Sequence, residues 1–175
     1  MKNKVKIFIV FAGCLLFRLL PLRAPNVEPI MASIMPIGKK YGAFLGFAFG
    51  FLSIFLYDAL THFGSWTWMV GITYGLVGVA SFFYFNKFKT SALNFAIFAF
   101  FATIIFDLIT GVLFAPMFGQ TMFSALVLQI PFTILHLAGN VGFALTLSPI
   151  LNKWLLVEKF FVLKKTLAKP NLAKV

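Results

Sequence analysis

Residues 92–114 read ALNFAIFAFFATIIFDLITGVLF, an apolar run that contains one acidic residue, Asp107. A helix of this length rises about 34 Å, enough to cross the roughly 30 Å of hydrocarbon in a bilayer. An ionisable side chain in lipid is costly, so it is normally retained because it binds, pairs with or moves something. The stretch therefore predicts a membrane-spanning helix that carries a functional polar group.

The rest of the chain shares this character, with 61% apolar residues, 11% charged residues and 25 phenylalanines among 175 residues. Soluble domains carry about 25% charged residues, so the composition favours an integral membrane protein. One cysteine, Cys14, and two histidines do not favour a metal site, and we expect no metal and no cofactor. The net charge of +11 comes mainly from lysines between apolar runs. Lysines between apolar runs typically set the orientation of a membrane protein. We therefore expect this protein to contact membrane lipid and not to bind nucleic acid.

Six apolar segments predict an all-α integral membrane protein, a six-helix transmembrane bundle with a short second helix and a single domain over residues 1–175. They cover about residues 5–20, 27–37, 41–60, 66–85, 92–114 and 122–151. The second is too short to cross the hydrocarbon, so we expect it to be tilted, partly re-entrant or buried in protein. Pro131 interrupts the sixth segment and predicts either a kinked long helix or an outer amphipathic segment before a helix that starts near Ile130. We favour the second, because 30 residues would overshoot the bilayer.

Basic residues alternate with the turns between these segments. Thirteen of the fifteen lie before or at the start of the first segment, after the second, after the fourth, or from Lys153 through a basic tail at residues 154–175. The turns at 61–65 and 115–120 contain no Lys or Arg. By the positive-inside rule we expect a multi-pass protein of the cell membrane with both termini and the tail in the cytoplasm.

The helical rise then gives the depth of the polar groups. Asp58 lies 18 residues beyond Lys40, and Asp107 lies 18 residues beyond Lys89. Each carboxylate is thus about 27 Å from the cytoplasmic edge. The polar groups of the other segments also fall in the outer half, over an apolar inner half, and we expect them to line one cavity. The predicted site residues are Arg18, Arg23, Asn26, Glu28, Asp58, His62, Trp66, Trp68, Asp107, Gln129, His136 and Asn140.

The sixth segment supports this convergence, because Gln129, Thr133, His136 and Asn140 fall on one helical face. Structural alternatives remain open for each predicted residue. The charged residues could neutralise one another as ion pairs, and the two tryptophans could belong to an interfacial aromatic belt. His136 could serve helix packing by making a hydrogen bond to a neighbouring helix.

Gly42, Gly46 and Gly50 repeat at four-residue spacing in the third segment. Small residues at this spacing let membrane helices approach closely. The pattern predicts either packing inside this protein or docking to another membrane protein, and we name these three glycines as candidate docking residues.

Two stretches carry a family resemblance: Pro25-Asn-Val-Glu-Pro29 at the opening of the short segment, and Gly38-Lys-Lys-Tyr-Gly-Ala-Phe-Leu-Gly46 at the start of the third. Residues 18–153 resemble the substrate-binding S component of energy-coupling factor transporters. The resemblance implies a vitamin-binding membrane protein that works with a transmembrane T component and two cytoplasmic ATPase subunits. It also implies a pocket near the outer face, formed here by residues 18–28, 58–68 and 120–140.

We therefore expect a protein that captures a vitamin-like small solute from outside and releases it inward with ATPase partners. The mixed sign of the charges favours a zwitterion or a large polar vitamin such as cobalamin or a pteridine. The alternatives are a solitary secondary carrier or proton-linked channel that uses Asp58 and Asp107, and a purely structural subunit. No nucleophile and base occur at a recognisable spacing, so we do not expect an enzyme.

Overall fold

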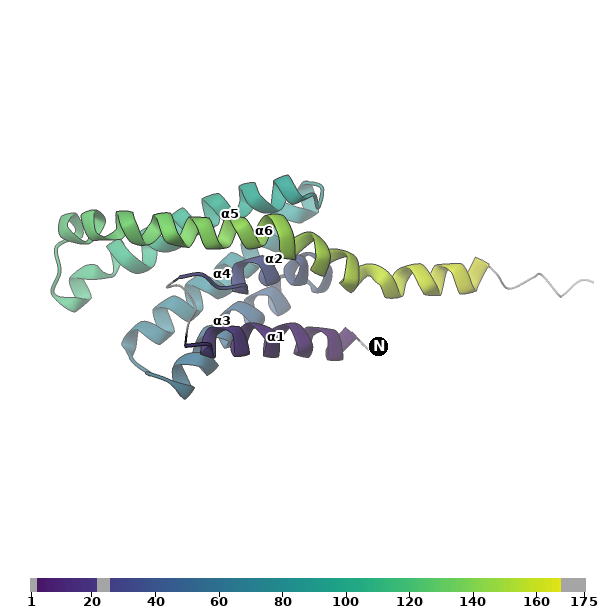
Figure 1. The fold of residues 1–175 in the computed structure, drawn as a ribbon, viewed down its shortest axis with the longest axis horizontal. Coiled ribbons are helices and arrows are strands. Elements are labelled where there is room, and N and C mark those ends of the chain that lie inside the picture. Colours follow the sequence, from purple (N-terminus) through teal and green to yellow (C-terminus); the bar gives the residue numbers. More distant parts are fainter. Residues whose placement is uncertain (1–2, 22–25, 168–175) are drawn as a thin grey trace, which may run out of the picture.

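The computed structural model describes residues 3–21 and 26–167, with side chains as far as residue 156. This part of the chain is all helical (Figure 1), without strands. The elements are α1 (Asn3–Leu19), α2 (Ile30–Tyr41), α3 (Ala43–Leu60), α4 (Ser65–Lys87), α5 (Ala92–Asp107), a π-helical segment η1 (Leu108–Leu113), a 3-10 turn η2 (Ala115–Phe118) and α6 (Met122–Leu167). Four helical stretches of the described chain are long and apolar enough to cross a membrane: 43–60, 65–87, 92–113 and 122–156.

The short helix α2 lies at the centre of the bundle. Its 12 residues rise only about 18 Å. Residues 30–38 are all buried, and helices α3, α4 and α6 pack around them. Of the three possibilities for the second segment, burial in protein is the one that the structure shows. A helix this short is tolerated in a bilayer because its neighbours, rather than lipid, cover its ends.

Glycines bring α3 and α4 into close contact along the bundle. A Cβ atom on Gly46 would lie 2.7 Å from the carbonyl oxygen of Gly78, and one on Gly50 would lie 2.5 Å from that of Tyr74. Gly46 and Gly50 are therefore used for packing inside this protein, and the structure does not leave them free for a partner. A Cβ atom on Gly42 would meet nothing within 4 Å, but its φ of +97° suits glycine at the sharp connection between α2 and α3.

The expectation for the sixth segment is corrected by the structure. One continuous helix, α6, passes through both Pro131 and Pro149, so the favoured start near Ile130 is wrong. Proline has a φ compatible with a helix, and its cost is mainly a missing backbone hydrogen bond and local crowding. The length argument fails because α6 extends along α5 and then past the ends of the other helices (Figure 1).

Lysines of α1 and α2 contact α4 and α6 at one end of the bundle. The Lys6 ammonium donates to the carbonyl oxygen of Trp154 over 2.8 Å, and Lys40 donates to that of Leu155. Lys39 donates to Asn86 over 3.1 Å. The start of α1 and the ends of α2 and α4 are therefore together, as the alternation of lysines with the turns predicts.

The α3–α4 contact gives a first prediction. Gly46→Ala should lower the free energy of unfolding by about 1–3 kcal/mol, because the added methyl overpacks the interface with Gly78. Gly13→Ala is the matched control, since its Cβ would meet nothing within 4 Å. Denaturant or thermal unfolding in detergent measures both variants. Equal stability of the two would contradict the packing described.

Candidate functional site

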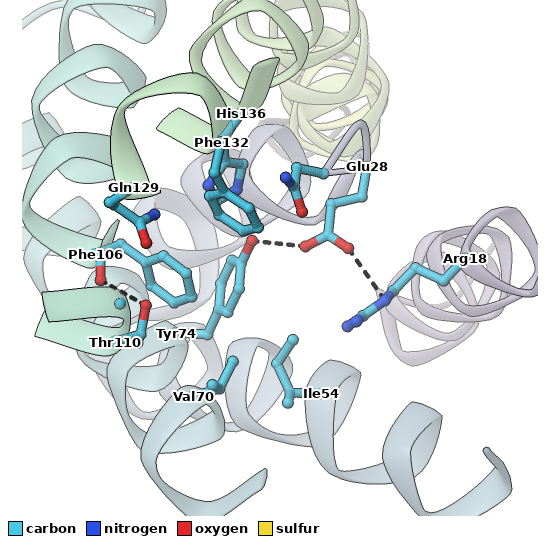
Figure 2. A pocket seen from close by; sticks show the side chains of 12 residues that line it. Arg18, Glu28, Ile54, Val70, Tyr74, Phe106, Thr110, Gln129, Phe132 and His136 are labelled. Carbon is cyan, nitrogen blue, oxygen red and sulfur yellow. Dashed lines mark hydrogen bonds and ion pairs between the residues drawn. The ribbon is translucent and has the colours of Figure 1, made fainter. Parts of the chain in front are cut away.

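A cavity of about 350 Å³ lies between α1, α3, α4, α6 and the end of α5 (Figure 2). Arg18 lines it from the end of α1 opposite to Lys6, so the cavity and the lysines lie at opposite ends of the bundle. Its walls combine apolar and aromatic side chains with a few polar groups, the composition usual for small-molecule sites. The lining residues are Arg18, Asn26, Glu28, Ile54, Val70, Tyr74, Phe106, Thr110, Gly111, Gln129, Phe132 and His136.

One side of the cavity is formed by a buried network around Glu28. Nε of Arg18 lies 3.1 Å from Oε2 of Glu28, and the Tyr74 hydroxyl donates to Oε1 over 2.6 Å. The Arg18 guanidinium also lies 4.0 Å from the ring centroid of Tyr57. These contacts join α1, the start of α2, α3 and α4, and they compensate a carboxylate that is 6% exposed.

The turn that delivers Glu28 has a defined local cause. Asn26 has a φ of 62°, a left-handed conformation that asparagine tolerates better than most residues. The backbone then passes so close to α6 that a Cβ on Gly139 would lie 3.1 Å from Cα of Val27. Pro29 follows and starts α2. Residues 26–29 are therefore the connection that holds a carboxylate at the N-terminus of the buried helix.

The other side of the cavity is formed by a second network, around Asp107. Oδ1 lies 2.7 Å from Nδ1 of His136, and Oδ2 accepts from the Thr133 hydroxyl over 2.7 Å. Gln129 reaches Thr133 at 3.4 Å. The carboxylate is 1% exposed, and of these four residues Gln129 and His136 line the cavity. Asp107 thus does not line the cavity itself but contacts His136, which does.

A π-helical turn follows Asp107 directly. Its extra residue per turn changes the register of η1 relative to α5, and such turns occur often at functional sites. Gly111 lies on this turn where a Cβ would collide with the side-chain amide of Gln129. The turn and the glycine together allow Gln129 to approach the cavity wall.

The predicted site residues separate into several places. Arg18, Asn26, Glu28, Gln129 and His136 line the cavity, with Asp107 behind His136. Asn140 is fully buried and donates to Thr103 of α5 over 2.9 Å. Arg23 lies outside the described residues.

Three aromatic residues of the prediction lie around the α3–α4 turn and not on the cavity wall. His62, Trp66 and Trp68 are exposed there. The Trp68 ring packs against Phe55 and Phe63, with centroids 5.4 and 5.9 Å apart. The position at the end of two long apolar helices suits the belt alternative for the tryptophans.

Asp58 also lies away from the cavity lining, and its carboxylate has a structural partner. Oδ2 accepts from the Thr67 hydroxyl over 2.8 Å, and that hydroxyl accepts from the backbone N–H of Gly64 over 3.1 Å. A carboxylate at this place stabilises the N-terminus of α4. Asp58 therefore holds the α3–α4 turn.

Several residues that line the cavity were not predicted from the sequence. Tyr74 is the main one, because it joins the Glu28 network from a helix face otherwise marked by Gly71, Gly75 and Gly78. A single large polar side chain among small ones was the available signal. Thr110 follows Thr103 and Asp107 at helical spacing, and that polar stripe was its signal in the sequence. Phe106, Phe132, Ile54 and Val70 are apolar, and nothing in the sequence separates them from ordinary packing residues.

Comparison of the chain with protein-family models, with curated proteins and with solved structures finds no match. The described part of the chain is an all-helical bundle of membrane-spanning character, with a polar, aromatic-walled cavity near one end.

The contact between Asp58 and Thr67 gives a second prediction. Asp58→Ala and Thr67→Val should each lower the free energy of unfolding by about 1 kcal/mol or more, since each breaks a buried hydrogen bond. In the double variant the two losses should be less than additive, because they remove the same contact. A double-mutant cycle of thermal or denaturant unfolding measures this coupling, and strict additivity would show that the contact does not form.

Proposed function

We propose that this chain is the substrate-binding S component of an energy-coupling factor importer. The observation that carries the proposal is the cavity between the Glu28 and Asp107 networks, which lies over a buried apolar helix. Such a site can hold a solute but offers no route through the bundle. A protein of this kind needs partners to release what it binds.

The closed floor of the cavity supports dependence on partners. Below Glu28 the core contains the fully buried side chains of Ile34, Met35 and Ile37 on α2, with Phe85 and Phe95 beside them. The described charged side chains lie around the cavity, at the α3–α4 turn or toward the lysine-bearing end. Solute release then requires a rearrangement of the helices, the step that a T component and two ATPase subunits would drive.

The size of the cavity limits the solute. A volume of about 350 Å³ is at the lower end of the range of about 300–1,000 Å³ found for ligand sites. A one- or two-ring molecule of pteridine size fits this space. A molecule as large as cobalamin would remain mostly outside it.

The topology that goes with this function is six spans in the cell membrane with both termini in the cytoplasm. The clustering of Lys6, Lys39 and Lys40 at one end supports this orientation, because the positive-inside rule then puts the cavity at the outer end. The central burial of α2 supports counting it as a sixth, incomplete span.

A proton-linked carrier is the second candidate, and the hydrogen bond between Asp107 and His136 favours it. Buried carboxylate–histidine pairs carry protons in membrane transporters. Asp58, the other acid of that hypothesis, is bound to Thr67 instead. The carrier predicts uptake without partners that uncouplers abolish.

Uptake by cells that produce this chain gives the direct test of the S-component proposal. With coexpressed T component and ATPase subunits, cells should accumulate solute at least about tenfold above cells that carry an ATPase-inactive variant. This chain alone should give binding without accumulation. Equal uptake with and without active ATPase subunits would contradict the proposal, and abolition of that uptake by an uncoupler would favour the carrier.

Thiol labelling tests the orientation in a Cys14→Ala background, where no other cysteine is present. A membrane-impermeant maleimide should label His62→Cys in intact cells, because the exposed α3–α4 turn faces outward. Lys89→Cys, exposed at the other end, should react only after the cells are permeabilised. The reverse pattern would place the cavity on the cytoplasmic side.

A further inference from the structure

We infer that the cavity selects a small organic cation, a one- or two-ring molecule that presents N–H donors. The inference rests on the proposed function, since it names the class of solute for the same site. It differs from the zwitterion or large polar vitamin expected from the mixed charges of the sequence. Three hydrogen-bond acceptors, the charge around the cavity and the nature of its walls support this class of solute.

The two hydroxyl groups that line the cavity already donate their protons to acceptors inside the protein. Tyr74 donates its hydroxyl proton to Glu28, and Thr110 donates its own to the carbonyl oxygen of Phe106 over 2.8 Å. A hydroxyl has one donor and two acceptor positions. Both oxygens can therefore offer only lone pairs to a bound molecule.

His136 adds another acceptor. The carboxylate of Asp107 accepts from Thr133 and, when ionised, cannot donate, so the proton of the short contact belongs to Nδ1 of His136. In the neutral ring the lone pair is then on Nε2. Nε2 makes no hydrogen bond within the described part of the chain, and the ring lines the cavity (Figure 2). A solute that donates an N–H to this nitrogen completes the network.

The charges of the described groups around the cavity also favour a cation. Glu28 and Asp107 contribute two negative charges, while Arg18 contributes one positive charge. The Arg18 guanidinium lies against both Glu28 and the ring of Tyr57. Glu28, Asp107 and Arg18 together leave one net negative charge, and its attraction for a cation is stronger in the low dielectric of the surroundings. Asp58 is held in the α3–α4 turn and does not line the cavity.

The walls fit a cation as well as an apolar ring. Tyr74, Phe106 and Phe132 supply aromatic surface, and Ile54 and Val70 supply aliphatic surface. Aromatic faces attract ammonium and related cations, most strongly when water is excluded. Together with the acceptors they favour a molecule with a flat apolar body and a cationic, hydrogen-donating edge.

Three probes with the same indole and ethyl chain test this class: tryptamine, tryptophol and indole-3-propionate. Calorimetry on the purified full chain in nanodiscs should show tryptamine binding at least about tenfold more tightly than tryptophol, because the ammonium adds charge-assisted hydrogen bonds. Indole-3-propionate should bind most weakly. Equal affinities, a preference for the carboxylate, or no binding of tryptamine would overturn the inference.

Glu28→Gln removes one negative charge and should reduce the preference for tryptamine over indole-3-propionate by about tenfold or more. Lys89→Gln is the matched control, because it changes the chain by one charge at the exposed opposite end and should leave the preference unchanged. An unchanged preference in Glu28→Gln would show that the carboxylate does not determine the class.

Nitrogen NMR of histidine-labelled protein gives a test that needs no ligand and no variant in the cavity. The chain has two histidines, and His62→Gln leaves the signals of His136 alone. At neutral pH the spectrum should show a proton on Nδ1 and a lone pair on Nε2. A proton on Nε2, in either the neutral ring or the doubly protonated ring, would overturn the acceptor assignment.

These outcomes separate the two proposals. A preference for indole-3-propionate would overturn the cation class and leave a partner-dependent importer possible. Uptake that is independent of the ATPase subunits would overturn the importer, while a tryptamine preference would still assign the class of solute for the cavity.

Discussion

The enclosure of α2 is the constraint on which the rest of the structure depends. In a bilayer every backbone polar group needs a partner inside the protein, so a 12-residue helix is stable at this depth only when other helices surround it. Because α2 is shorter than its neighbours, space remains beyond its N-terminus. The cavity occupies that space, and Glu28, two residues before the helix, reaches into it. The buried apolar core and the cavity beyond it thus have one cause.

The same enclosure explains the distribution of small and charged residues. Around α2 the helices must pack closely, and the contact of Gly46 with Gly78 allows α3 and α4 to do so. At the C-terminal end of α2, Lys40 binds the backbone of α6, and at the other end Arg18 and Tyr74 bind Glu28. Polar contacts therefore hold both ends of an otherwise apolar bundle.

Much of this arrangement could be predicted from hydropathy and charge. The third and fourth segments were expected at 41–60 and 66–85, and the helices are Ala43–Leu60 and Ser65–Lys87. The helical rise predicted similar depths for Asp107 and His136, and the two side chains are in contact. The partner of Asp58 was missed because it depends on the conformation of a turn, which periodicity does not report. The path of α6 through Pro131 was missed because proline weakens a helix without always ending it.

Native mass spectrometry of the gently solubilised protein tests most directly the claim that this cavity holds a solute. We predict that the wild-type chain retains one small organic molecule, and that Val70→Trp, which fills the cavity from α4, loses it. Ile72→Trp, which adds the same side chain on the exposed face of α4, should retain the molecule. A wild-type protein that carries only lipid, or a Val70→Trp variant that holds the same small molecule, would contradict the account.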